Sequence, residues 1–178
     1  MLAWLQLFCT VAAGQQAMSF VQPSATNHAS ASDEFWMEEA LRCAQRALEI
    51  GEVPVGAVVV RQGQIVGRGW NRNISTFDPT AHAEIVALRE AGITIGNHRL
   101  EDCELFVTIE PCAMCAGAMV HARIKRLIYG ADDPKAGAVR SVTQVLNHPQ
   151  LNHKIQVQSG VLAGRSAEML QTFFKNRR

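Results

Sequence analysis

Three side chains of the kinds that bind zinc are spaced in this sequence as in a catalytic metal site. His82 opens the triplet His82-Ala83-Glu84, and the pair Cys112 and Cys115 begins thirty positions further on. Zinc accepts imidazole nitrogen and thiolate sulfur, and a site with three protein ligands keeps its fourth position for water. Water bound to zinc loses its proton near neutral pH and can then attack an electron-poor carbon. The spacing therefore predicts hydrolytic chemistry.

Glu84 is the candidate for moving protons in that chemistry. It follows His82 by two residues, which is about 200° around an ideal helix. The side chain is therefore poorly placed to bind the same metal ion and better placed beside the water. A carboxylate there takes up a proton and returns it to a leaving amine.

Each part of this pattern also has an explanation without catalysis. A Cys-x-x-Cys pair alone occurs in structural zinc sites and redox pairs, and His-x-Glu occurs on solvated helices. Cys103, Cys43 or His98 is available as a fourth ligand that would close a structural site. The ordered set of His-x-Glu, a strand and Pro-Cys-x-x-Cys is much more specific, and it is the signature of zinc-dependent deaminases. We therefore favour catalytic zinc.

Hydrophobic periodicity predicts the elements that position these residues. A helix is predicted from about Asp33, where acidic residues precede apolar residues at helical spacing, to Gly51. A hairpin that turns at Gln62-Gly63 follows it. Strands and helices then alternate, which indicates an α/β fold with a mixed sheet covered by helices. The expected elements are strands over 55–60, 64–70, 105–109, 126–129 and 155–158, and helices over 82–91, 112–121 and 165–174.

In this arrangement both halves of the metal motif fall where a strand or loop enters a helix. The partial positive charge of a helix N-terminus favours the thiolate form of a cysteine such as Cys112. Two helix starts would then converge on one metal ion.

Size and composition indicate a single intracellular domain. The chain has 178 residues, 48% of them hydrophobic and 19% charged, and no apolar run approaches the roughly 20 residues that span a bilayer. Five cysteines with one Cys-x-x-Cys pair do not suggest a disulfide framework. The count is typical of a reducing compartment, so we expect a cytoplasmic protein without a membrane segment.

Residues 1–32 are interpreted as a flexible N-terminal extension, and residues 33–178 as the folded domain. Residues 1–13 are apolar, yet no Lys or Arg precedes Arg42, so the basic start of a signal peptide is missing. Met18 is an alternative start codon, in which case the first seventeen residues belong to an over-extended gene assignment. The intact mass of the native protein tests this hypothesis.

The charge is unevenly distributed although the net charge is only +1. Residues 121–178 contain ten Lys or Arg against three Asp or Glu, whereas residues 1–120 contain seven against thirteen. A basic C-terminal third can attract a polyanion such as RNA. A solvated face is the alternative that charge alone leaves open.

The flanks of the metal motif resemble the bacterial tRNA-specific adenosine deaminases of the cytidine deaminase superfamily. The similarity extends from about Glu34 to Arg178. The matching segments are Glu52-Val53-Pro54-Val55-Gly56-Ala57, Gly69-Trp70-Asn71, Asp78-Pro79-Thr80-Ala81-His82-Ala83-Glu84, Glu110-Pro111-Cys112-Ala113-Met114-Cys115-Ala116-Gly117-Ala118 and Phe173-Phe174.

The resemblance implies a fold, an activity and partners. The expected fold is a three-layer α/β/α sandwich around a five-stranded mixed sheet. The expected reaction is hydrolytic deamination of adenosine to inosine at the wobble position of a tRNA anticodon, with an arginine tRNA of anticodon ACG as the substrate. One zinc ion per subunit, a homodimer and binding of the tRNA anticodon stem-loop are also expected.

The resemblance assigns roles to individual residues. It maps the zinc ligands onto His82, Cys112 and Cys115 and the proton shuttle onto Glu84, and it places substrate contacts at Asn71, Val53, Ala83 and Asp133. Without it, Asn71 would be interpreted as a turn cap, Val53 as a core residue and Asp132-Asp133-Pro134 as a simple turn.

Basic residues of the C-terminal third are candidates for contacts with RNA phosphates. They are Arg123, Lys125, Arg126, Lys135, Lys175, Arg177 and Arg178. Phe173 is expected in the core, although an aromatic pair with Phe174 beside a basic end could also pack near RNA.

Two other functions remain as alternatives. A deaminase of free guanine or cytosine would use the same zinc chemistry, but it would not need a basic surface. A zinc-stabilised RNA-binding module without catalysis would need a fourth protein ligand for the metal.

Overall fold

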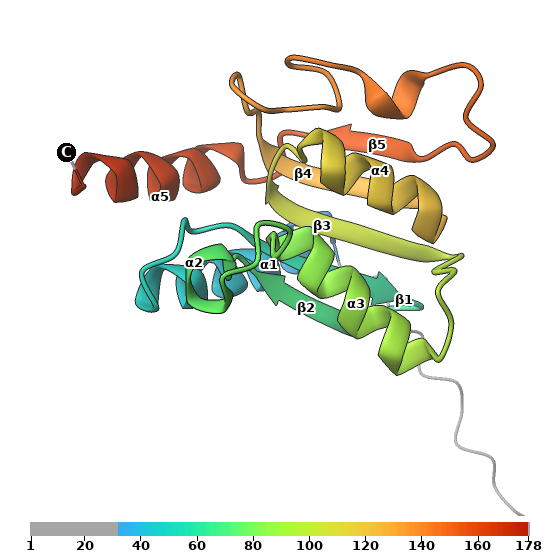
Figure 1. The fold of residues 1–178 in the computed structure, drawn as a ribbon, viewed down its shortest axis with the longest axis horizontal. Helices are drawn as coiled ribbons and strands as arrows, with labels where there is room; N and C mark the ends of the chain where they lie inside the picture. Colours follow the sequence, from blue (N-terminus) through green and yellow to red (C-terminus); the bar gives the residue numbers. More distant parts are fainter. Residues whose placement is uncertain (1–31, 178) are drawn as a thin grey trace, which may run out of the picture.

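The computed structural model describes residues 32–177 and contains one five-stranded mixed sheet between two layers of helices (Figure 1). The expected extension over 1–32, apart from Ser32, and the expected phosphate contact Arg178 lie outside the described residues. None of the helices in the described part of the chain combines the length and apolar character that crossing a bilayer requires. The helices and strands are α1 (Asp33–Glu49), β1 (Gly56–Arg61), β2 (Gln64–Trp70), α2 (Asn73–Thr76), α3 (Ala83–Ile95), β3 (Cys103–Ile109), α4 (Ala113–Ala122), β4 (Arg126–Ala131), the 3₁₀ turn η1 (Val145–Asn147), β5 (Gln156–Ser159) and α5 (Ala163–Lys175).

Every helix and strand expected from the sequence is present, with ends that differ by a few residues. The largest difference is in α3, which continues to Ile95 because Gly96, at φ 70°, is the residue that ends it. The short helix α2 and the turn η1 were not expected.

The sheet has the strand order β2-β1-β3-β4-β5. β1 is antiparallel to both β2 and β3, whereas β3, β4 and β5 are parallel. The hairpin pairs Gly56 with Trp70, and the first crossover runs from β3 through α4 to β4. These findings confirm the expected mixed sheet.

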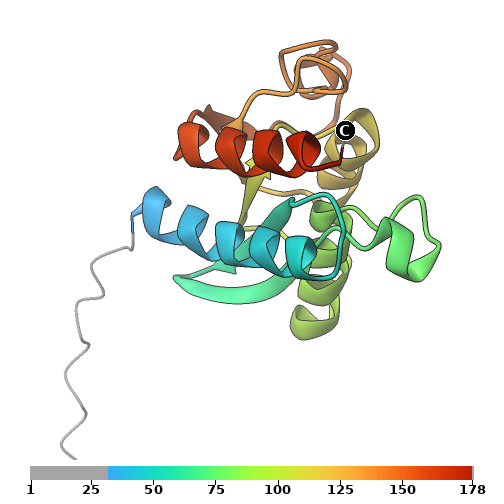
Figure 2. The same ribbon diagram turned by 90° about the vertical axis from the view of Figure 1, so that its left-hand side faces the viewer.

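Alternation along the strands separates two apolar layers. Val58, Phe106 and Ile128 pack against α1, together with Met37 and Cys43 from that helix. The intervening strand residues face α3 and α4 on the other side, and they are Ala57, Val59, Leu105, Val107, Leu127 and Tyr129. Figure 2 shows α1 and α5 on one side of the sheet and α3 and α4 on the other, which confirms the three-layer α/β/α sandwich.

The N-terminus of α3 lies close to the hairpin because the facing residue of β2 has no side chain. A Cβ atom added to Gly69 of β2 would overlap the carbonyl oxygen of Ala83 and lie 2.5 Å from the amide nitrogen of Ala87. Both neighbours are backbone atoms in the first turns of α3, so they cannot rotate away. Glycine at this position therefore sets how closely the helix that carries Glu84 approaches the sheet.

Replacing Gly69 with alanine is expected to lower the free energy of unfolding by about 2 kcal/mol, because the new methyl group must displace the α3 backbone. Chemical denaturation measures this change. Gly164→Ala in α5 is the matched control, because a Cβ there meets nothing within 4 Å. It should stabilise the protein by up to about 1 kcal/mol. Equal effects of the two substitutions would contradict the close-contact explanation.

Candidate active site

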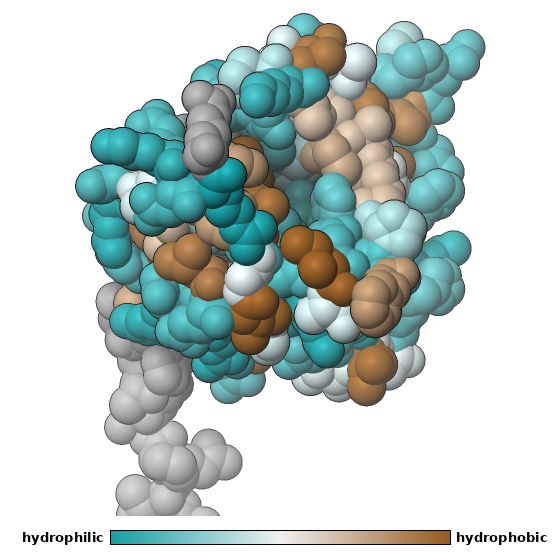
Figure 3. Space-filling view, turned by 60° about the vertical axis from the view of Figure 1, so that its left-hand side comes forward, coloured by the Kyte–Doolittle hydropathy of each residue, from teal (hydrophilic) through white to brown (hydrophobic). Residues whose placement is uncertain are grey.

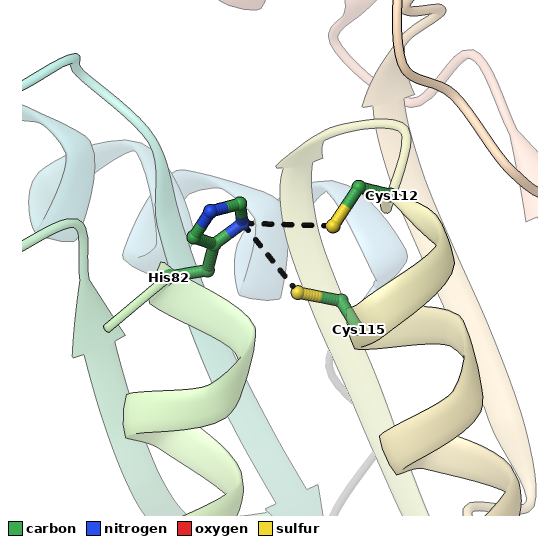
Figure 4. Close-up of side chains that lie close together, drawn as sticks. All are labelled: His82, Cys112 and Cys115. Carbon is green, nitrogen blue, oxygen red and sulfur yellow. Dashed lines mark hydrogen bonds between the residues drawn. The ribbon is translucent and has the colours of Figure 1, made fainter. Parts of the chain in front are cut away.

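Two helix N-termini bring the three predicted metal ligands together. His82 is the N-cap residue of α3, Cys112 is the N-cap residue of α4, and Cys115 lies in the first turn of α4. His82 Nδ1 lies 3.7 Å from the Sγ atom of each cysteine (Figure 4). The three ligand atoms all lie within 4.8 Å of one another.

This geometry fits a zinc ion. Bonds of about 2.3 Å to sulfur and about 2.0–2.1 Å to nitrogen, at tetrahedral angles, place nitrogen and sulfur about 3.6 Å apart. The observed separations of 3.7 Å are close to that value. Within residues 32–177, the group that can hold a metal ion consists of these three side chains. Cys103, Cys43 and His98 are therefore not placed as a fourth ligand, which argues against a closed structural site.

The cysteines differ in their affinity for a proton. A hydrogen bond from Cys115 lowers the pKa of Cys112 to about 3, and His82 adds to this effect against the opposing influence of burial. The same hydrogen bond, together with burial, raises the pKa of Cys115. The hydrogen bond to Cys112 likewise raises the pKa of His82, although burial opposes it. Because zinc binds thiolate sulfur and neutral imidazole, a metal ion would displace the protons that these ligands carry.

Glu84 is buried beside the metal ligands. It lies in the first turn of α3, and only 2% of its surface is exposed. Burial raises the pKa of this carboxyl group above its usual range, while the charge of His82 partly opposes the effect. A raised pKa makes the carboxylate a better proton acceptor, which is what a proton shuttle requires.

A cavity of about 430 Å³ opens in front of these residues. It adjoins a second cavity of about 590 Å³ along the loop after β4 and α5, and the two share lining residues. The space-filling view of this side shows a hollow with polar residues in its visible interior (Figure 3). The shared lining residues are Ile109, Asp133, Lys135, Leu170 and Phe174.

The four predicted substrate contacts lie at or beside the first cavity. Val53, Asn71 and Asp133 line it. Asn71 accepts a hydrogen bond through Oδ1 from the Ala83 amide at 2.9 Å, and so satisfies the first amide of α3. Ala83 itself is fully buried.

Asp133 both lines the cavity and stabilises a turn. Its Oδ1 accepts hydrogen bonds from the amides of Lys135 at 2.9 Å and Ala136 at 3.2 Å. The turn interpretation and the position at the cavity are therefore compatible.

The predicted phosphate contacts are divided between different parts of the molecule. Lys135, Lys175 and Arg177 line the second cavity, and the Arg177 guanidinium also stacks 4.3 Å from the Phe173 ring centroid. Phe173 is buried, as expected for a core residue, whereas Phe174 is half-exposed and lines both cavities.

The other basic candidates lie away from the cavity. Arg123 is the C-cap residue of α4 and Lys125 follows it. α4 has 10 residues, so about 15 Å separates these side chains from the metal end of the helix. Arg126 is paired with Asp33 at 3.0 Å and Glu104 at 2.5 Å, and so it is not available as a free phosphate contact.

Two buried carboxylates at the cavity were missed by the sequence analysis. Glu52 and Glu110 are each 2% exposed and both line the cavity. Glu52 accepts a hydrogen bond from the Ser75 amide at 2.7 Å, and Glu110 accepts several from the loop after β4. The available signal was an acidic residue between apolar neighbours, because a carboxylate is rarely buried without partners.

Comparison with known proteins identifies the family. Residues 30–131 match the family described as the cytidine and deoxycytidylate deaminase zinc-binding region. The chain belongs to this zinc-dependent deaminase family. It is 50% identical over 147 residues to a tRNA-specific adenosine deaminase of Haemophilus influenzae, and the match covers 82% of this chain and 85% of that protein. At this level of identity, the chain is a member of the tRNA-specific adenosine deaminase branch.

Solved structures show the same fold. A structure from a study of A-to-I editing by tRNA deaminases at the wobble position is similar to this deaminase with a TM-score of 0.74 and 47% identity, covering 76% of this chain and 99% of that one. A guanine deaminase from Nitrosomonas europaea has a TM-score of 0.72 at 24% identity, with 80% and 85% covered, and it supports the fold alone.

Replacing Cys112 with alanine is expected to abolish zinc binding, because two ligands cannot hold the ion at comparable affinity. Metal analysis of the purified protein measures this loss, and thermal unfolding should show a lower Tm. Cys103→Ala is the matched control, since Cys103 is a buried free cysteine that lies outside the metal-binding group. Zinc retained by the Cys112 variant would contradict the assignment.

Proposed function

We propose that this deaminase converts adenosine to inosine at the wobble position of a tRNA anticodon, with an arginine tRNA of anticodon ACG as its substrate. The observation that carries the proposal is a three-ligand metal site with a buried glutamate, at the base of a cavity that continues into a groove bearing two lysines. The similarity to tRNA-specific adenosine deaminases supports the same conclusion. We place the reaction in the cytoplasm.

His82, Cys112 and Cys115 would hold one zinc ion per subunit. Zinc, when bound, supplies an activated water molecule as the nucleophile at neutral pH. Glu84 takes one proton from the attacking water and delivers it to the ring nitrogen, and it then transfers the second proton of that water to the amino group, which leaves as ammonia. Its burial keeps these transfers away from bulk solvent.

The cavity would receive an adenine base that has left the anticodon stack. Val53 forms an apolar wall, and the Asn71 amide group can hydrogen-bond to the nucleoside while its Oδ1 remains on the Ala83 amide. Enzymes that modify a base extrude it in this way, because its reacting atom is inaccessible in the stack.

The second cavity, which adjoins the first, would receive the neighbouring nucleotides. Lys135 and Lys175 can contact phosphates, Arg177 lines the same cavity, and half-exposed Phe174 offers a face for base stacking. Arg123 and Lys125 are outside this proposed anticodon surface, because they lie at the far end of α4.

A homodimer is the proposed assembly. α3 and α4 lie side by side on one face of the sheet (Figure 1), and a groove of about 800 Å³ runs between them. Its lining is largely apolar, and Ile93 at its edge is 83% exposed. An exposed apolar surface of this kind is typical of a protein interface.

Conversion of tRNA and its dependence on Glu84 test the reaction. The zinc-loaded protein should convert the wobble adenosine of the ACG arginine tRNA to inosine, measured by sequencing. Glu84→Ala should lower conversion at least about 10³-fold while retaining zinc, because it removes the proton carrier and no metal ligand. Loss of metal in this variant would contradict the role of Glu84. Ammonia release from free guanine or cytosine without tRNA conversion would identify a small-molecule deaminase instead.

The assembly is tested by replacing Ile93 with glutamate. The wild-type protein should have about twice the mass of the 19.5 kDa chain in analytical ultracentrifugation. Ile93→Glu should shift it to the monomer, because a charge in an apolar interface is costly. Ile50→Glu is the matched control, since Ile50 is 52% exposed at the end of α1 in the other layer. A wild-type monomer at assay concentration would contradict the proposal.

A further inference from the structure

Glu110 occupies an unusual position between the sheet, a metal ligand and the substrate cavity. It directly follows β3, precedes Cys112 by two residues, and is 2% exposed. Among residues 32–177, no cationic side chain pairs with its carboxylate. Instead, five donors from the loop 132–141 surround it, and they are the amides of Asp133, Val139, Arg140 and Ser141 and the Ser141 hydroxyl.

The donors are shared between the two carboxylate oxygens. Oε1 accepts the amides of Val139 at 3.0 Å, Arg140 at 2.7 Å and Ser141 at 3.0 Å. Oε2 accepts the Asp133 amide at 3.1 Å and the Ser141 hydroxyl. Both oxygens of Glu110 therefore accept hydrogen bonds from the loop. Glu110 is for this reason not a candidate proton carrier, in contrast to Glu84.

The loop also approaches Glu110 more closely than a side chain would allow. A Cβ atom on Gly137 would overlap the Glu110 carboxylate and lie 2.6 Å from the Asp133 carbonyl oxygen. The Ala138 amide donates to the Pro111 carbonyl at 2.8 Å, and Gly137 forms a bridge with Cys112. The loop is thus attached both to the buried carboxylate and to the segment that carries a metal ligand.

The rim of the same loop faces the substrate cavity. Lys135 is exposed and Asp133 partly exposed, and both line the cavity in front of the metal ligands. Arg140 does not reach Glu110 with its side chain, because it pairs with Asp132 across the mouth of the loop at 2.7 Å. An exposed rim with few apolar contacts keeps one conformation only where hydrogen bonds hold it.

We propose that Glu110 is a positioning residue whose carboxylate shapes the loop 132–141, so that Asp133 and Lys135 are presented to the tRNA in register with the metal-binding segment. The inference rests on the proposed function, and it adds a determinant of substrate binding distinct from the residues that perform the chemistry. Hydrogen bonds to a charged acceptor are stronger than neutral ones, so a carboxylate holds such a loop better than an amide does.

The test is Glu110→Gln in the full chain loaded with zinc. The substitution preserves size but turns one acceptor oxygen into an NH₂ group that faces loop donors. KM for the ACG arginine tRNA should rise about ten-fold, the change expected for the loss of one charged hydrogen bond. kcat should remain within about three-fold and the zinc content should be unchanged, since no ligand or proton carrier is altered.

A second measurement does not depend on turnover. In a Glu84→Ala background, the Kd for the same tRNA should rise by about the factor seen in KM. Glu104→Gln is the matched control, because it changes the same residue type on the same strand, where Glu104 pairs with Arg126. This control should alter Tm while KM stays at the wild-type value.

Two milder changes keep the proposal testable if Glu110→Gln does not fold. Ser141→Ala removes one donor and should raise KM by about two- to five-fold. Gly137→Ala should raise KM by a similar or larger factor, because the methyl group pushes the loop away from the carboxylate. Unchanged KM in both variants would overturn the proposal.

The outcomes separate this inference from the proposed function. Suppose first that the wild-type protein converts the tRNA. If Glu110→Gln then lowers only kcat, loses zinc, or loses activity in proportion to its folded fraction, the positioning role is wrong. The proposed function stands in each of these cases. If the wild-type protein neither binds nor converts the tRNA, the proposed function fails and the inference fails with it.

Discussion

The site depends on the convergence of two helix N-termini at one end of the sheet. His82 and Cys112 are both N-cap residues, and each has an extended backbone conformation just before its helix begins. Both side chains therefore point into the same space. The separations of 3.7 Å from His82 Nδ1 to the two Sγ atoms result from this convergence. α3 can lie this close to the sheet because β2 presents Gly69 to its first turns.

Buried carboxylates organise the surroundings of the metal ligands, and each has a different environment. Glu84 is surrounded by the metal ligands and has a raised pKa, caused mainly by burial. Burial also raises the pKa of Glu110, but hydrogen bonds from Ser141, Arg140 and Asp133 outweigh it and lower the pKa to about 2. The same residue type is therefore proposed to carry protons at one position and, as a carboxylate, to shape a loop at the other.

The positions of the metal-binding segment and of the second cavity follow from the architecture of the sheet. The ends of β3 and β4 carry the metal-binding segment and the loop 132–141, while α5 on the opposite layer adds Phe174 and Lys175 to the second cavity. The residues proposed for the chemistry lie at the starts of α3 and α4. The proposed substrate contacts are distributed over the loop 132–141 and α5, where exposed positive charge is compatible with solvent.

The order of the main helices and strands and the candidate metal ligands could be predicted from the sequence, because strand and helix periods and the zinc preferences of His and Cys are local properties. The mixed sheet follows from that order. Which polar groups meet, in contrast, depends on the three-dimensional fold. The donors to Glu110 come from residues 23 to 31 positions later, and Arg126 pairs with Asp33 across 93 positions. Contacts at such separation depend on how the chain folds back, which no local pattern encodes.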